Sequence, residues 1–113
     1  MTPRPAVSAE MASMLNTSVF RQKTAFGLAW KIPNGTYDVF FWVMENVRDN
    51  HRRFDASIEG VPVLRDVGRG AVLGEWGKLG PFRVTVQDGV LNVDLIPRKT
   101  DAHLMGLAVF EAP

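Results

Sequence analysis

Two charged residues, Glu45 and Arg52, flank a polar stretch that separates two apolar segments of the chain. A charge at the end of an otherwise apolar strand face needs a partner. Arg52 lies seven residues after Glu45, so a hairpin can bring the two side chains together. The carboxylate can serve a ligand or, as we favour here, the pair forms a structural salt bridge that closes the loop.

Aromatic residues are the second group with informative chemistry. Sugar-binding sites stack an apolar face of the sugar on an exposed ring, while polar side chains bind the hydroxyls. The candidates are Phe20, Trp30, Trp42 and Trp76. Trp42 lies within a long apolar segment, which favours the core, and Trp30 can be either core or surface. Trp76 follows Glu75 in a glycine-rich stretch and is the best candidate for an exposed ring.

Residues for catalysis are not grouped in this sequence. His51 and His103 lie in separate polar segments without the spacing of metal ligands. No local Ser-His-Asp signature is present, and the glycine-rich stretch 68–80 lacks the Lys-Ser/Thr ending of a phosphate-binding loop. The chain contains no cysteine, which excludes thiolate chemistry and disulfides. We therefore predict a protein that is not an enzyme and has no cofactor or metal site.

The charge balance excludes several partners. Thirteen basic and twelve acidic residues give a net charge of +1, which argues against a dedicated nucleic-acid or membrane-surface binder. The N-terminus shows no pattern of a signal peptide, and no apolar stretch reaches the roughly 18 residues that span a bilayer. These observations leave the compartment open.

The elements that position the candidate residues read as strands. Residues 36–44 are almost all β-branched or aromatic, with one Asp, and both alternating faces are largely apolar, which predicts a central strand covered on both sides. Residues 54–58 alternate apolar and polar side chains, as a half-buried strand does. Asp88-Gly89 predicts a two-residue hairpin between strands at 81–86 and 90–96, and 104–110 reads as a last strand.

About eight short strands result, with turn residues every eight to twelve positions. This spacing predicts an all-β fold, a two-sheet antiparallel β-sandwich of the jelly-roll type. Pro62 would confine its strand to a sheet edge or a bulge. We expect residues 1–12 to form a flexible leader and residues 13–113 to form a single domain.

Two sequence patterns on neighbouring strands resemble a known family. They are Gly35-x-Tyr37-x-Val39-x-Phe41-x-Val43-x-Glu45, and Arg52-x-Phe54-Asp55-x-x-Ile58-x-Gly60. Both resemble the signature of malectin-like carbohydrate-binding modules, which have a galactose-binding-like jelly-roll fold, and the pattern at 84–95 is similar too. The resemblance covers about 20–111 and lacks the family's first strands, so the chain looks N-terminally shortened. An unpaired sheet edge, covered by the leader or by a second copy, would follow.

The resemblance implies a non-catalytic module that binds a glycan or polysaccharide. The family's binding aspartate in the last loop carries over to Asp101, and Phe20 is the nearest match to its binding aromatics. The aromatic pair expected after Glu45 is replaced by Val47-Arg48. Related sandwiches often hold a structural Ca²⁺, but no ligand cluster around Asp101 predicts one here.

The expected binding loops are 46–53, 68–80 and 97–103. The alternative is a structural or interaction module that has lost sugar binding and self-associates through an open sheet edge as a homo-oligomer. A lectin-like module needs exposed aromatic rings beside Asp101, whereas an assembly module needs an apolar edge that is buried between chains.

Overall fold

The computed structural model describes Pro3, Val19–Gln22 and residues 25–113, without the side chains of Val19–Gln22. The expected leader, 1–12, therefore lies outside the described residues except for Pro3. The strands are β1 (Val19–Gln22), β2 (Phe26–Lys31), β3 (Gly35–Met44), β4 (Arg53–Ile58), β5 (Val61–Val67), β6 (Trp76–Val86), β7 (Val90–Lys99), β8 (Asp101–Leu104) and β9 (Gly106–Glu111).

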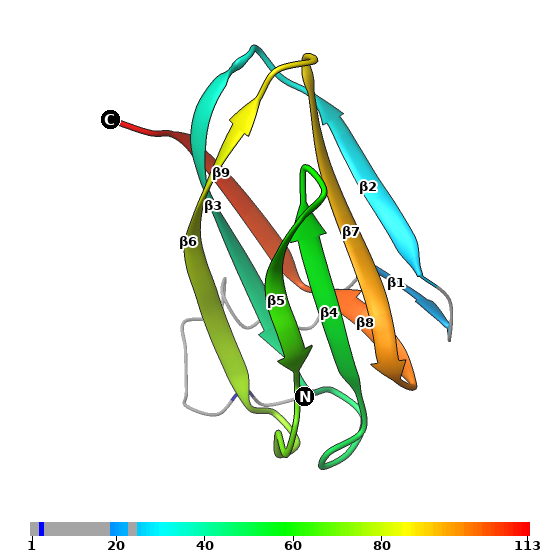
Figure 1. Cartoon of the computed structure of the whole chain (residues 1–113). Coiled ribbons are helices and arrows are strands. Elements are labelled where there is room, and N and C mark those ends of the chain that lie inside the picture. Colours follow the sequence, from blue (N-terminus) through cyan, green and yellow to red (C-terminus); the bar gives the residue numbers. More distant parts are fainter. Residues whose placement is uncertain (1–2, 4–18, 23–24) are drawn as a thin grey trace.

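The strands form two layers (Figure 1). One sheet has the order β2-β7-β4-β5 and the other has the order β6-β3-β9, while β1 pairs with β8 as a separate ribbon. Every strand pair is antiparallel. This arrangement confirms the predicted all-β sandwich. The described part of the chain contains no helix that is long and apolar enough to cross a membrane.

The hairpin between β4 and β5 follows the local chemistry. Ile58 pairs with Val61, and the two turn residues, Glu59 and Gly60, have φ values of 52° and 77°. Positive φ at both central positions is typical of a type I′ hairpin, whose twist matches that of the flanking strands. Pro62 lies in β5 at the edge of its sheet, as predicted, because its nitrogen cannot donate to a ladder.

The hairpin predicted at Asp88-Gly89 is wrong. The turn joins β6 to β7, and these strands belong to different sheets. The turn that leads into β3 crosses between the sheets in the same way, and the two turns lie together at the upper end in Figure 1. The Gly89 nitrogen donates to Asn34 Oδ1 over 2.7 Å, and the Ile32 nitrogen donates to the Gly89 oxygen over 3.0 Å. These bonds fix a corner of the sandwich rather than a hairpin.

The core fills the space between the sheets. Its largest buried side chains come from both layers: Phe41, Phe54, Ile58, Leu91, Leu95, Val39, Val86 and Val93. The opposite face of β3 is covered near its end, where Met44 and Met105 are buried and Trp42 and Trp76 pack against them. Farther back on this face Phe40 is only half-buried, so among the described residues the prediction of a β3 covered on both sides holds for part of the strand. Lys78 Nζ lies 4.5 Å from the Phe40 ring centroid, so its charge and stem shield Phe40.

The last third of the chain is more regular than predicted. The expected polar loop before the last strand is reduced to Thr100, which has a φ of 65° between β7 and β8. The single predicted last strand is divided at Met105 into β8 and β9. Asp101 therefore begins a strand instead of lying in a loop.

Candidate functional site

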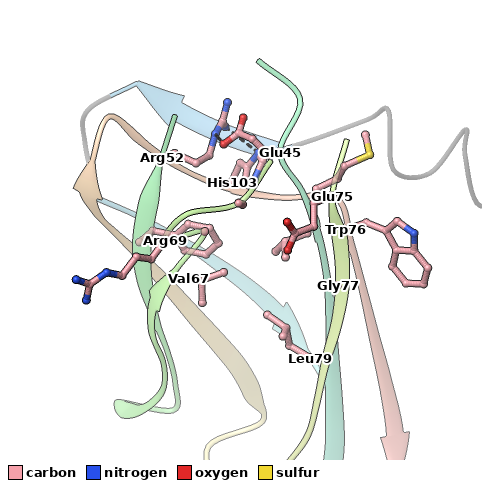
Figure 2. Close-up of a pocket in the computed structure, with 14 residues that line it drawn as sticks. Glu45, Arg52, Val67, Arg69, Glu75, Trp76, Gly77, Leu79 and His103 are labelled. Carbon is pink, nitrogen blue, oxygen red and sulfur yellow. Dashed lines mark hydrogen bonds and ion pairs between the residues drawn. The ribbon is translucent and has the colours of Figure 1, made fainter. Parts of the chain in front are cut away.

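A pocket opens at the end of the sandwich where β3 finishes and β4 begins, with a cavity volume of about 190 Å³. Figure 2 shows its walls, which come from both sheets and from the loops at 45–52 and 68–75. The lining residues are Val43, Met44, Glu45, Arg52, Phe54, Val67, Gly68, Arg69, Ala71, Glu75, Trp76, Gly77, Leu79 and His103.

Backbone hydrogen bonds join the two loops that bound the pocket. The Glu45 nitrogen donates to the Glu75 oxygen over 3.0 Å, and the Gly74 nitrogen donates to the Glu45 oxygen over 2.7 Å. Farther out, the Asn50 nitrogen donates to the Ala71 oxygen over 2.7 Å. These bonds hold the loops as one layer over the cavity, so its polar residues sit on an ordered frame.

Three buried polar side chains meet inside the pocket. Glu45 and Arg52 are each 4% exposed, and His103 is 2% exposed. Arg52 Nη1 lies 2.8 Å from His103 Nδ1, and Arg52 Nη2 donates to Asn46 Oδ1 over 3.1 Å. Glu45 Oε2 accepts from the Val47 nitrogen over 3.1 Å. The cluster joins the end of β3, the start of β4 and the middle of β8.

One atom of each charged partner makes no hydrogen bond among the described residues. Arg52 Nε lies 3.6 Å from Glu45 Oε1, which is an ion-pair distance but too long for a hydrogen bond. Both atoms are buried and lack a hydrogen-bond partner in the described part of the chain. Leaving a buried donor or acceptor unpaired costs about 1–3 kcal/mol, and more when the group is charged. A small polar group beside the pair, within hydrogen-bond distance of both atoms, would remove this cost.

His103 is neutral in this setting. Burial and then the charge of Arg52 lower the pKa of His103 from 6.5 to about 3, with a smaller contribution from His51. Because Arg52 can only donate, His103 Nδ1 must be the acceptor, and the ring proton belongs on Nε2. The imidazole therefore orients the guanidinium and does not add a second charge.

The remaining walls of the pocket are largely apolar. Phe54 packs against His103 edge to face, with 5.9 Å between the ring centroids. Val67 and Leu79 line the cavity from β5 and β6. The volume lies below the roughly 300–1,000 Å³ of sites for drug-sized ligands, so the pocket suits one small ring. Apolar walls with one polar cluster are suited to a molecule that has both apolar and hydroxyl faces.

The predicted binding residues are not gathered at one place. Trp76 begins β6 and lines the pocket, but it is half-buried, and Figure 2 shows its ring turned away from the polar cluster. Trp30 is 40% exposed near the end of β2, at the other end of the sandwich (Figure 1). Asp101 is 7% exposed and pairs with Gln22, two positions along the ribbon from the Phe20–His103 pair. Phe20 and Asp101 thus lie on the same ribbon of β1 and β8 but are not paired.

Glu45 and Arg52 come together as the sequence suggested, whereas the role of His103 was missed. Its separation of 51 residues from Arg52 leaves no local spacing to detect. The one signal in the sequence was the position of His103 in a segment where polar and apolar residues alternate, as they do in a half-buried strand. Among the described residues, no group of histidine and carboxylate side chains is arranged to hold a metal ion.

No family model matches the sequence, and no curated protein sequence matches it. Solved structures do match. The plant receptor-like kinase ANX1 has a TM-score of 0.72 at 16% identity, over 88% of this chain and 32% of that one. A chain in the complex of the plant peptide RALF23 with FER and LLG2 has a TM-score of 0.64 at 15% identity, over 97% of this chain and 36% of that one.

A bacterial enzyme also contains this fold. The β-glucuronidase of Bacteroides uniformis has a TM-score of 0.70 at 14% identity, over 83% of this chain and 11% of that one. The chain thus spans about a tenth of the enzyme and about a third of the plant proteins. At these identities the likeness shows the fold alone.

Proposed function

For a chain with the malectin-like, galactose-binding-like β-sandwich fold, we propose the function of a non-catalytic carbohydrate-binding module. Its site is the pocket around Glu45, Arg52 and His103, which takes one sugar ring. The observation that carries the proposal is the buried ion pair between Glu45 Oε1 and Arg52 Nε, whose two atoms make no hydrogen bond in the described part of the chain. The likeness in fold to receptor ectodomains and to part of a glycosidase supports a binding role but does not choose a ligand.

The donor and acceptor of this pair match a hydroxyl group. A carboxylate oxygen only accepts hydrogen bonds and a guanidinium nitrogen only donates them. A sugar hydroxyl does both, so one hydroxyl can donate to Glu45 Oε1 while it accepts from Arg52 Nε once a small shift of the buried pair opens these atoms to the cavity. Hydrogen bonds to charged partners are worth about 1.5–3 kcal/mol each, which suffices for a weak, specific site.

The shape of the pocket supports a ring. Val67 and Leu79 offer apolar surface beside the polar cluster, as the C–H face of a sugar requires. Asp101 lies two residues before His103 in β8 and is therefore on the same face of that strand. We propose Asp101 as a further binding residue, with Phe20 and Trp76 as secondary candidates, whereas Trp30 would serve only a second site at the other end of the sandwich.

The test is an NMR titration of the ¹⁵N-labelled chain with a panel of monosaccharides and short oligosaccharides. Ala71→Leu, which fills the cavity from its lining without touching the ion pair, should abolish saturable shifts in the pocket residues. Ala29→Leu, a change of the same size at an exposed position of β2, should leave binding intact. Binding that survives Ala71→Leu but is lost in Asp101→Asn would move the site to β8.

The absence of catalysis is tested in the same samples. The pocket lining includes two carboxylates, Glu45 and Glu75, and glycoside hydrolysis needs such a pair. Glu45 forms an ion pair with Arg52, and Glu75 Oε1 accepts from the Val72 nitrogen over 3.1 Å. Both carboxylates therefore already take part in interactions that stabilise the loops. The panel sugars should be recovered unchanged. Release of reducing sugar that Glu75→Gln abolishes would show an enzyme.

A further inference from the structure

The four outer strands of the two sheets are not equally protected. β5 contains Pro62, and its pairing with β4 has register shifts. The pairing of β6 with β3 shifts register at Gly80-Pro81, and β2 ends in the charged Lys31. These are common ways to prevent one sheet edge from pairing with another. β9 has no proline, no lysine and no register shift against β3, and its one charge is the terminal Glu111. Between Gly106 and Glu111 every side chain of β9 is apolar.

The three-stranded sheet is also one strand short of its partner sheet. Leu107 and Val109 point from β9 toward the core, yet both remain half-exposed. On the outer face, Phe110 is 58% exposed and packs against the Phe40 ring, edge to face at 5.9 Å. A strand added beside β9 would cover all three side chains.

The sequence of β9 is complementary to itself. Antiparallel partners must lie on the same face, so a two-fold pairing is centred on a residue and not between residues. Centred on Ala108, it places Phe110 opposite Gly106 of the second copy and Leu107 opposite Val109. Gly106 has no side chain, and its own in-sheet neighbour is Trp42, so the partner's Phe110 would fill the space beside another aromatic ring.

The neighbouring register is less favourable. Centred on Val109, the pairing places Glu111 opposite Leu107 and buries a carboxylate against an apolar side chain, which costs free energy. We therefore propose that a second copy of the chain adds to β9 in the register centred on Ala108. The result is a continuous sheet, β6-β3-β9-β9-β3-β6, with a two-fold axis through its centre.

A single cysteine tests both the partner and the register, because the chain has none of its own. Directly opposed residues in an antiparallel pair have Cα atoms about 4.5–5.5 Å apart, inside the roughly 4.4–6.8 Å that a disulfide spans. Ala108→Cys should therefore give a covalent dimer under mild oxidation. Ala29→Cys, the same substitution on the outer strand β2, is the control and should remain largely monomeric.

Light scattering of the uncrosslinked full chain completes the test. The chain should be a dimer, and Phe110→Lys should convert it to a monomer, because the charge would oppose the hydrophobic contact. Val61→Lys, at a side chain of equal exposure on β5, should leave the dimer unchanged. A chain that is monomeric at high micromolar concentration, or that dimerises only after residues 1–18 are removed, would overturn the proposal. Equal crosslinking of both cysteine variants would overturn it as well.

Discussion

Arg52 and His103 share a buried hydrogen bond, in which Arg52 Nη1 donates to the ring Nδ1 over 2.8 Å. His103 lies in β8 and Arg52 directly precedes β4, and both side chains are almost fully buried. This bond fixes the guanidinium plane, so that Nε faces Glu45 without reaching it. The neutral imidazole is thus part of what prepares the pocket for a hydroxyl group.

The first prediction concerns pH. Because the pKa of His103 is about 3 in the fold and near 6.5 in the unfolded chain, protonation favours unfolding. The contribution of the neutral His103 to the free energy of unfolding is complete above pH 6.5. It falls by about 1.4 kcal/mol for each pH unit as the pH decreases toward 3. Urea unfolding should show a loss of about 2 kcal/mol between pH 6.5 and pH 5, before most carboxyl groups titrate.

The second histidine provides the control for this experiment. His51→Gln should keep the pH slope and leave one imidazole signal in the NMR spectrum, since the chain has two histidines. That signal should not shift between pH 7.5 and pH 5. A His103 resonance that titrates near pH 6.5 would contradict the account of a buried neutral ring.

The second prediction concerns the ion pair. Removal of one partner of a buried pair leaves an uncompensated charge and costs about 3–5 kcal/mol, whereas replacement of both by apolar residues is often neutral. Glu45→Met and Arg52→Met should each lower the free energy of unfolding strongly. The double variant should recover much of the loss in chemical denaturation. Additive losses would show that the two side chains do not interact.

The third prediction concerns the pocket wall formed by Gly68. Gly68 has a φ of 93°, and a Cβ added there would lie 2.5 Å from the Arg52 oxygen. Gly70 has a similar φ of 70° but open space at its Cβ position. Gly70→Ala should cost about 1–2 kcal/mol from backbone strain alone. Gly68→Ala should cost clearly more in thermal unfolding, and equal losses would mean that the loop moves away freely.

The fourth prediction separates the two faces of β3. Phe41 is fully buried, whereas its neighbour Phe40 lies half-buried on the outer face under Lys78. Phe41→Ala should cost about 3–5 kcal/mol in urea unfolding, as a core phenylalanine does. Phe40→Ala should cost much less. A large loss in Phe40→Ala would mean that further protein covers this face.

The general fold could be predicted because strand patterns and turn residues are local. The edge position of Pro62 follows directly from its missing N–H group. The Asp88-Gly89 turn misled because a tight turn looks the same whether it joins strands of one sheet or crosses between two. The outer face of β3 was predicted only in part, because Phe40 is as apolar as a core residue and yet lies under Lys78 from β6, whereas Trp42 packs against the buried Met44.

The candidate site was only half visible in the sequence. Glu45 and Arg52 are close along the chain, so their pairing was easy to infer. His103 comes from β8, and the apolar walls Val67 and Leu79 come from two other strands. Their meeting depends on how the two sheets stack, which local patterns do not encode. Trp76 illustrates the opposite error, since its glycine-rich surroundings suggested a loop where a strand begins.

The most direct measurement follows the Nε–H signal of Arg52 during titration with sugars, assigned by its loss in Arg52→Lys. A sugar that binds in the pocket should shift this signal saturably, because its hydroxyl accepts from Nε. The Nε–H of Arg83, which pairs with Asp38 on the outer face, should stay in place. Binding that leaves the Arg52 signal unchanged, or no binding at millimolar sugar, would contradict the pocket as a carbohydrate site.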